Sequence, residues 1–297
     1  MSSNDQTIDR KGYLFAMGAF GIWGLVPIFW KTLSHIPSSI LILERVLWAA
    51  PFFALVLSWK KSWAALRPIW KSPRLLLGLG LSSTLIAINW SLYVWAVNAN
   101  HIVEASLGYF INPLFNIALG ALFFGERWSP IQKLGVLLTS ISVAYLTIQT
   151  QSIWISLSLA GTFGLYAVVR KKLPLKALEA SAFESFVVAG IAALSLLFWS
   201  PPWPDQEMNW STQLLIVLSG PLTAIPLVWF NEAARRIPLS HLGFFQYTSP
   251  TLQFLIGVFV FHEAFDAQRL MAYSLIWLAV LFVAFEAYQK ERAFTRT

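Results

Sequence analysis

Long apolar stretches separated by short polar breaks follow one another along almost the whole chain. Each stretch is about 17–25 residues long, which is the length of a helix that crosses a bilayer. We expect ten such helices, at about 13–31, 39–59, 75–97, 102–124, 131–149, 153–170, 181–199, 211–234, 239–262 and 268–288. The pattern therefore predicts an all-α membrane protein with ten transmembrane helices.

The spacing of particular residues in the first half recurs in the second half. Gly24, Lys31 and Glu44 recur 140 residues later as Gly164, Lys171 and Glu184. Pro113, Gly120, Phe124 and Glu126 recur 137 residues later as Pro250, Gly257, Phe261 and Glu263. We therefore predict two five-helix repeats, residues 1–149 and 150–297. Because each repeat holds an odd number of spans, the second is inverted relative to the first, an arrangement typical of secondary transporters.

Basic residues alternate along the chain as the loops of a membrane protein do. If the N-terminus lies inside, eighteen of the 21 Lys and Arg residues fall in inner loops or tails. Positive residues accumulate on the cytoplasmic side, so the pattern predicts N-in and C-in topology. The same rule accounts for the net charge of +7, and we expect no nucleic-acid partner.

The amino-acid composition argues against a soluble domain and against several kinds of functional site. The chain is 57% hydrophobic and 12% charged, against about 25% charged residues in soluble domains. It has no cysteine, and its four histidines show no ligand spacing, so we expect no metal site and no cofactor. No Gly-rich loop ends in Gly-Lys-Ser/Thr, so ATP hydrolysis is not indicated.

Ionisable residues inside apolar stretches are costly and usually face a cavity or a partner. Glu44 and Arg45 lie early in the second stretch, and Glu184 lies at the repeat-equivalent position of the seventh. These residues are candidates for gating or proton coupling, but they could equally form fixed ion pairs between helix ends. The candidate partners are Lys31 for Glu44, and Lys171 or Lys172 for Glu184.

The fourth and ninth stretches contain matching prolines. Glu104 begins the fourth stretch and is a further gating or coupling candidate. Pro113 and Pro250 remove a backbone donor, and paired helix breaks in corresponding spans point to a binding site. The alternative is that both prolines only kink their helices. Glu126, after the fourth stretch, is expected to cap a helix end or form an ion pair.

Polar and aromatic residues near these breaks are candidates for a central cavity. The cavity candidates are Trp23, Asn89, Trp90, Tyr93, Asn112, Gln246 and Tyr247. Amide and aromatic side chains suit a hydrophobic or cationic organic solute. Many of the 15 tryptophans instead have the positions of interface anchors near span ends.

Three runs carry a family resemblance: 104–113 (EASLGYFINP), 89–98 (NWSLYVWAVN) and 242–247 (LGFFQY). Together with the repeat, they resemble the EamA family of the drug/metabolite transporter superfamily. Within it they resemble the RarD-type subfamily, named for a chloramphenicol-sensitivity phenotype. The resemblance implies a multi-pass permease of the bacterial inner membrane. It also implies a cavity formed by spans one to four and six to nine, with spans five and ten as scaffold.

The sequence thus favours a secondary active transporter that moves a small organic metabolite or drug-like solute by alternating access, with proton coupling as one option. A facilitative uniporter or exchanger is the alternative. A channel would need repeated polar or charged rings, and an enzyme would need a catalytic cluster, neither of which the sequence offers. The expected partners are a small-molecule substrate and the lipid bilayer, with the chain as a monomer or homodimer.

Overall fold

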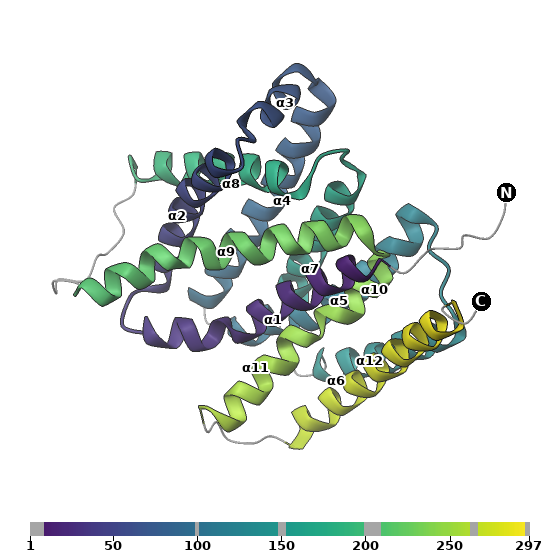
Figure 1. The fold of residues 1–297 in the computed structure, drawn as a ribbon. Coiled ribbons are helices and arrows are strands. Elements are labelled where there is room, and N and C mark those ends of the chain that lie inside the picture. The colour runs from purple at the N-terminus through teal and green to yellow at the C-terminus, as the bar shows by residue number, and fades with distance from the viewer. Residues whose placement is uncertain (1–8, 99–100, 148–152, 199–208, 262–266, 295–297) are drawn as a thin grey trace.

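The chain is built of helices joined by short connections (Figure 1). The structure, a computed structural model, describes residues 9–98, 101–147, 153–198, 209–261 and 267–294. The first half contributes α1 (Arg10–Thr32), α2 (Ser38–Trp59), η1 (Trp63–Leu66), α3 (Arg67–Lys71), α4 (Pro73–Asn98), α5 (Ile102–Phe124) and α6 (Pro130–Thr147). The second half contributes α7 (Ile153–Lys172), α8 (Ala177–Ser195), α9 (Trp210–Arg236), α10 (Leu239–Gln246), α11 (Thr248–Phe259) and α12 (Ala267–Phe294).

A helix lies at each of the ten predicted ranges, with the ninth range divided between α10 and α11. Within the described residues, seven helices are long and apolar enough to cross a membrane: α1, α2, α4, α5, α7, α8 and α9. The prediction of an all-α, multi-pass membrane protein is confirmed, while the count of ten crossings stays a prediction. The short helices η1 and α3 were not predicted.

The two matching prolines have different effects on the backbone. In the ninth range, α10 ends at Gln246 and α11 begins at Thr248, with Pro250 in its first turn. Pro113 lies inside α5, which continues unbroken to Phe124, so the predicted helix break at Pro113 is wrong. A proline removes a single hydrogen bond, and packing can hold the remainder of the helix together. Here Gly243 packs against Pro113, and a Cβ on that glycine would lie 2.6 Å from the proline carbonyl oxygen.

The helices of each half pack mainly against helices of the other half. In the first half α1 packs against α9 and α11, and its counterpart α7 packs against α4 and α5. Likewise α2 packs against α9, and its counterpart α8 packs against α4. The remaining pair, α6 and α12, lie side by side at one edge of the bundle (Figure 1). The packing partners are thus reciprocal, as a duplicated structure requires.

A carboxylate from the first half caps a helix of the second half. Glu126 follows α5 and accepts hydrogen bonds from the backbone N–H groups of Leu239 (2.7 Å) and Ser240 (2.9 Å). These are the first two residues of α10, whose N–H groups have no partner inside the helix. The negative charge also opposes the positive end of the helix dipole. The predicted role of Glu126 as an end cap is confirmed, while its counterpart Glu263 lies outside the described residues.

Candidate functional site

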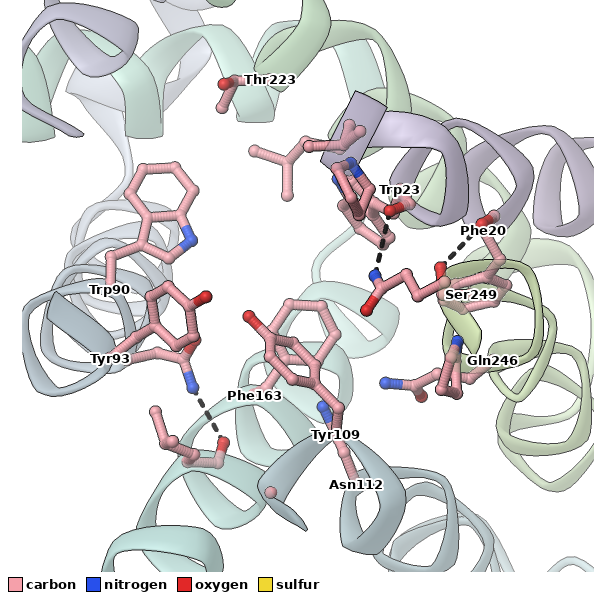
Figure 2. Close-up of a pocket in the computed structure, with 18 of the residues that line it drawn as sticks. Phe20, Trp23, Trp90, Tyr93, Tyr109, Asn112, Phe163, Thr223, Gln246 and Ser249 are labelled. Atoms are coloured by element: carbon pink, nitrogen blue, oxygen red, sulfur yellow. Dashed lines mark hydrogen bonds between the residues drawn. The ribbon is translucent and has the colours of Figure 1, made fainter. Parts of the chain in front are cut away.

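A cavity of about 270 Å³ lies between the helices of the two halves. Its walls come from α1, α2, α4 and α5 of the first half and from α7, α9, α10 and α11 of the second (Figure 2). Among the described residues, α6, α8 and α12 contribute nothing to the lining. This matches the expected scaffold role of spans five and ten, but span seven, expected at the cavity, lies away from it.

Six of the seven predicted cavity residues line this space: Trp23, Asn89, Trp90, Tyr93, Asn112 and Gln246. Tyr247 does not, and its predicted place in the cavity is wrong. It is 1% exposed, and its hydroxyl donates to the backbone carbonyl of Phe110 at 3.1 Å. Successive helical residues differ by about 100° in direction, so Gln246 faces the cavity while its neighbour faces the core. Contact of the six with a substrate stays a prediction.

Several lining residues are related by the two offsets of the sequence repeat. Trp23 and Phe163 are equivalent at an offset of 140, and both line the cavity. The offset of 137 relates two further pairs of lining residues, Tyr109 with Gln246 and Asn112 with Ser249. Phe163, Tyr109 and Ser249 were not predicted as cavity residues, and the repeat register is the signal that would have found them.

Seven of the 21 described residues that line the cavity are aromatic. Trp23 meets Phe163 edge to face with 6.2 Å between ring centroids, and Tyr93 meets Tyr109 in the same way at 5.9 Å. Tyr109 is 49% exposed although it lies on a helix between other helices, because it borders the hollow. Apolar walls with a few polar groups are typical of sites for small organic molecules.

Hydrogen bonds from α11 tie it to α1 across the cavity wall. Pro27 cannot donate to the carbonyl of Trp23, and the Nε2 of Gln253 donates to that oxygen at 3.2 Å (Figure 2). Ser249 Oγ donates to the carbonyl of Phe20 at 2.7 Å. The proline in α1 thereby leaves an acceptor that the other half satisfies.

Asn89 connects two helices as well as lining the cavity. Its Nδ2 donates to the carbonyl of Leu159 (2.8 Å) and to Thr162 Oγ1 (2.9 Å), both on α7. The amide hydrogens are therefore already used within the protein. This side chain holds α4 against α7, and only its oxygen is left for a ligand.

Arg45 lies in the cavity lining, although the sequence suggested it for gating. Its guanidinium carbon is 5.2 Å from the ring centroid of Trp90, and Tyr93 and Tyr109 line the same cavity. No hydrogen-bond partner for Arg45 Nε is present in the described part of the chain, although this atom is shielded from solvent.

A second polar cluster surrounds Glu184, away from the cavity. Its carboxylate accepts hydrogen bonds from Ser82 Oγ (2.5 Å) and from the Tyr166 hydroxyl (3.0 Å). Arg170 forms an ion pair with it, with 3.5 Å between Nε and Oε1. Asn231 Nδ2 then donates to the Tyr166 hydroxyl at 2.7 Å. Each of these five residues is at most 1% exposed, so the cluster joins α4, α7, α8 and α9 in the protein interior.

The ion-pair partner of Glu184 is therefore Arg170, and neither Lys171 nor Lys172. Lys171 Nζ instead donates to the carbonyls of Ala234 (2.9 Å) and Ile237 (2.5 Å). Lys172 lies over the ring of Phe123, 4.6 Å from its centroid.

Glu44, the repeat equivalent of Glu184, has no such cluster of ion pairs around it among the described residues. Among the described residues no ion pair joins Glu44 to Lys31, and Lys31 Nζ lies 5.5 Å from the ring centroid of Phe261. Glu44 is partly exposed. The side chain of Glu104 lies outside the described part of the chain.

The cavity and the Glu184 cluster occupy opposite halves of the bundle. The cavity uses the second half of α4, at Asn89, and the first half of α7, at Leu159. The cluster uses the first half of α4, at Ser82, and the second half of α7, at Arg170. One end of the molecule is therefore hollow while the other is closed by buried polar contacts.

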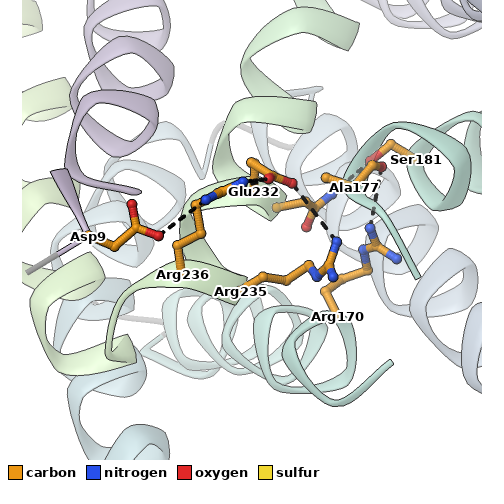
Figure 3. A network of polar contacts seen from close by, with 8 residues as sticks. Asp9, Arg170, Ala177, Ser181, Glu232, Arg235 and Arg236 are labelled. Carbon is orange, nitrogen blue, oxygen red and sulfur yellow. Dashed lines mark hydrogen bonds and ion pairs between the residues drawn. The ribbon is translucent and has the colours of Figure 1, made fainter. Parts of the chain in front are cut away.

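Charged residues gather at the closed end (Figure 3). Arg236 Nη2 lies 2.5 Å from Glu232 Oε1, and Arg236 Nη1 lies 3.2 Å from Asp9 Oδ2. Asp9 also accepts a hydrogen bond from the Gly12 N–H at the start of α1. Partial burial acts to raise the pKa of Asp9, but the contacts with Gly12 and Arg236 outweigh it and hold the pKa below its ordinary value.

Comparison with known proteins gives consistent matches over nearly the whole chain. The model of the EamA-like transporter family matches twice, over residues 10–148 and 151–285. An uncharacterized transporter of Pseudomonas aeruginosa is 44% identical, over 95% of this chain and 96% of the relative. The protein RarD of Escherichia coli is 36% identical, over 95% of this chain and 97% of the relative. A crystal structure with 18% sequence identity covers 93% of this chain and 98% of its own with a TM-score of 0.76, a likeness in fold alone.

Proposed function

Because this chain belongs to the EamA-like transporter family, and within it is RarD-like, we propose that it is a secondary transporter that moves a small organic solute by alternating access. Family membership makes the protein a membrane transporter and not an enzyme. The observation that carries the proposal is the cavity between the two repeats, in a bundle that is hollow toward one end and closed at the other. Binding at a repeat interface is the arrangement expected of such transporters.

We propose ten spans, arranged as inverted repeats over residues 1–149 and 150–297, with both termini inside the bacterial inner membrane. The gathering of Asp9, Lys171 and Arg236 at one end supports this topology, because these residues come from three predicted inner segments. The alternation of basic loops supports the same orientation.

The absence of cysteine from the sequence permits a direct test of topology. Single cysteines at the exposed positions Ser34 and Lys60 are treated with a membrane-impermeant maleimide on intact cells. We expect Ser34→Cys to react and Lys60→Cys to react only after the membrane is opened. The reverse result would contradict the N-in orientation.

In this topology the hollow end faces outward, and the Glu184 cluster closes the inner side. Access from the inside then requires the Arg170–Glu184 pair and the Lys171 contacts to separate. Glu184 is thus proposed as a gate residue. Glu44, Glu104 and Lys31 stay proposals for gating or proton coupling.

A cavity cysteine tests which side is open. Thr223 lines the cavity, whereas Ala180 on α8 is fully buried. The impermeant maleimide applied outside should label Thr223→Cys and leave Ala180→Cys unlabelled. Equal labelling of the two would contradict an outward-facing cavity.

Transport itself is tested with purified protein. Small organic metabolites and antibiotics are screened by ligand-induced thermal shift, and each hit is tested for counterflow in proteoliposomes with and without an imposed pH gradient. We expect saturable counterflow, and we expect it to be lost in Glu184→Gln protein that thermal unfolding shows to be folded. Unitary conductance would indicate a channel, and uptake that ignores both the proton gradient and Glu44→Gln would remove proton coupling.

A facilitative exchanger or uniporter is the second candidate. The described lining residues include no Asp or Glu that could carry a coupling proton through the cavity. Counterflow without any response to the pH gradient would favour this candidate.

A further inference from the structure

The cavity contains a positive charge with no negative partner among the residues that the structure describes. Arg45 lines the cavity, and no Asp or Glu is among the other described lining residues. Its Nε is shielded from solvent without a hydrogen-bond partner. Arginine is always charged at physiological pH, so the imbalance cannot be relieved by losing a proton.

The surroundings of Arg45 hold the guanidinium without neutralising it. Trp90 lies against the group at 5.2 Å from its centroid, which is a cation–π contact. Tyr93 and Tyr109 line the same cavity, and their side chains carry neutral hydroxyls. A ring that contacts the face of a guanidinium leaves the two terminal Nη groups available, and these match a carboxylate in bidentate geometry.

An unpaired charge in a largely apolar cavity is expensive unless a ligand supplies the opposite charge. One guanidinium and no other basic lining residue in the described part of the chain match a ligand group with a single negative charge. A carboxylate meets this requirement better than a doubly charged phosphate ester. The aromatic side chains of Trp23, Trp90 and Phe163 suit a flat, apolar ligand body.

A second unsatisfied group lies in the same cavity. Asn112 is 5% exposed, and its Oδ1 has no hydrogen-bond partner among the described residues. It is three residues beyond Tyr109 on α5, so the two side chains lie on neighbouring parts of one helix face. The oxygen is shielded in this structure, and a ligand donor such as a hydroxyl or an N–H group would satisfy it once the amide turns toward the cavity.

We propose that Arg45 binds the anionic group of the transported solute, and that the solute is an aromatic or similarly flat organic carboxylate with a hydrogen-bond donor for Asn112. This inference rests on the proposed transport function and names its substrate class. It replaces the hydrophobic or cationic solute expected from the sequence, because the sequence did not place Arg45 in the cavity.

The test uses four matched probes on the purified full-length protein. 3-Phenylpropionate, 3-phenylpropionamide and 3-phenylpropylamine share a body and differ in charge, and 3-phenyllactate adds a hydroxyl to the acid. Affinity is measured by titration calorimetry for the native protein, Arg45→Gln, Arg45→Lys and the control Arg74→Gln, which removes an exposed arginine at the start of α4, outside the cavity.

The native protein and Arg74→Gln should bind the acid about tenfold or more tightly than the amide and the amine. Arg45→Gln should lose that preference, and Arg45→Lys should keep part of it. 3-Phenyllactate should bind more tightly than 3-phenylpropionate, and Asn112→Leu should abolish this difference. Thermal unfolding of each variant establishes that it is folded before affinities are compared.

The proposal is overturned if the amide or the amine binds as tightly as the acid, if no acid binds, or if folded Arg45→Gln keeps the acid preference. Counterflow in proteoliposomes separates this failure from failure of the transport function. Counterflow of the amide or amine but not of the acid would leave transport standing and reject the anion site. Binding of the acid through Arg45 without counterflow would support the site and reject transport.

Discussion

The cavity around Arg45 and the cluster around Glu184 each contain a buried arginine, but among the described residues only the arginine of the cluster is paired with a carboxylate. Arg170 is 1% exposed and is paired with Glu184, whose second oxygen is bonded by Tyr166. Arg45 lies over Trp90 and has no carboxylate partner in the described part of the cavity. The first arginine is neutralised within the protein, while the second leaves its charge for something outside the chain.

The difference teaches how to distinguish a structural charge from a functional one. A buried ion pair contributes little net stability, but removal of one partner is costly because a charge is left unpaired. An arginine that is already unpaired carries that cost in the free protein. Substitutions at the two sites should therefore change stability in opposite directions.

The largest effect is expected from Glu184→Gln. This change keeps the shape of the side chain but leaves Arg170 without its counter-charge, so the free energy of unfolding should fall by about 3–5 kcal/mol. Chemical denaturation in detergent measures the loss. The matched control is Glu44→Gln, at the repeat-equivalent position, where no described ion pair exists and the loss should stay below about 1 kcal/mol.

Equal losses of stability in Glu184→Gln and Glu44→Gln would show that the ion pair with Arg170 does not set Glu184 apart from Glu44. The double variant Glu184→Gln/Arg170→Met sharpens the same test, because it removes both charges. It should recover a large part of the stability that Glu184→Gln loses, as expected for residues that interact directly.

Substitution of the arginines themselves is expected to have a smaller but opposite pair of effects. Arg170→Gln should lower the melting temperature, since it leaves the carboxylate of Glu184 buried without its ion pair. Arg45→Gln should leave the stability of the ligand-free protein unchanged or raise it, because an unpaired charge is removed. The free energy of unfolding should rise by at most about 1 kcal/mol, and the melting temperature should not fall. A large destabilisation by Arg45→Gln would indicate a hidden structural partner.

Tyr247→Phe is expected to have a moderate effect on stability alone. The change removes the hydrogen bond to the Phe110 carbonyl in the core, at a cost of about 1 kcal/mol. Affinity for 3-phenylpropionate should be unchanged, because Tyr247 does not line the cavity. Titration calorimetry compares this variant with Tyr93→Phe, which alters a tyrosine that lines the cavity. Weaker binding of 3-phenylpropionate by Tyr247→Phe would contradict the placement of Tyr247 in the core.

The smallest effect is expected at Asp9. Its pKa lies below the ordinary value, so its contacts contribute stability above the unfolded pKa of about 3.9 and lose it as the pH falls through the folded value. Asp9→Asn keeps the helix cap but removes the ion pair with Arg236. The stability lost at neutral pH should be well under 1 kcal/mol and should shrink further in high salt. Melting curves from pH 7 to pH 3 test this, and the variant should show the weaker dependence on pH.

Much of the fold could be predicted because a membrane restricts the choices available to the chain. Apolar length alone located helices at all ten ranges, and the repeat offsets relate Trp23 to Phe163 across the cavity. The short helices η1 and α3 escaped prediction because each is at most five residues long. Such segments leave no periodic signal in an apolar pattern.

Side-chain direction is what the sequence could not supply. Arg170 and Lys171 are adjacent, yet a turn of about 100° sends one to Glu184 and the other to the carbonyls of Ala234 and Ile237. The same step separates Gln246 in the cavity from Tyr247 in the core. Which of two neighbours faces the site depends on the neighbouring helices, and those contacts are long-range in the chain.

The cap that Glu126 provides for α10 also has a consequence for biogenesis. Glu126 lies 113 residues before Leu239, so the ribosome synthesises the carboxylate long before the backbone N–H groups that donate to it. Leu239 and Ser240 are buried at the inner end of the bundle, so α10 packs with its first amides satisfied only where the carboxylate that follows α5 is already in place. The order of translation is thus matched to the order of assembly, and a C-terminal half produced alone would lack the template for this helix.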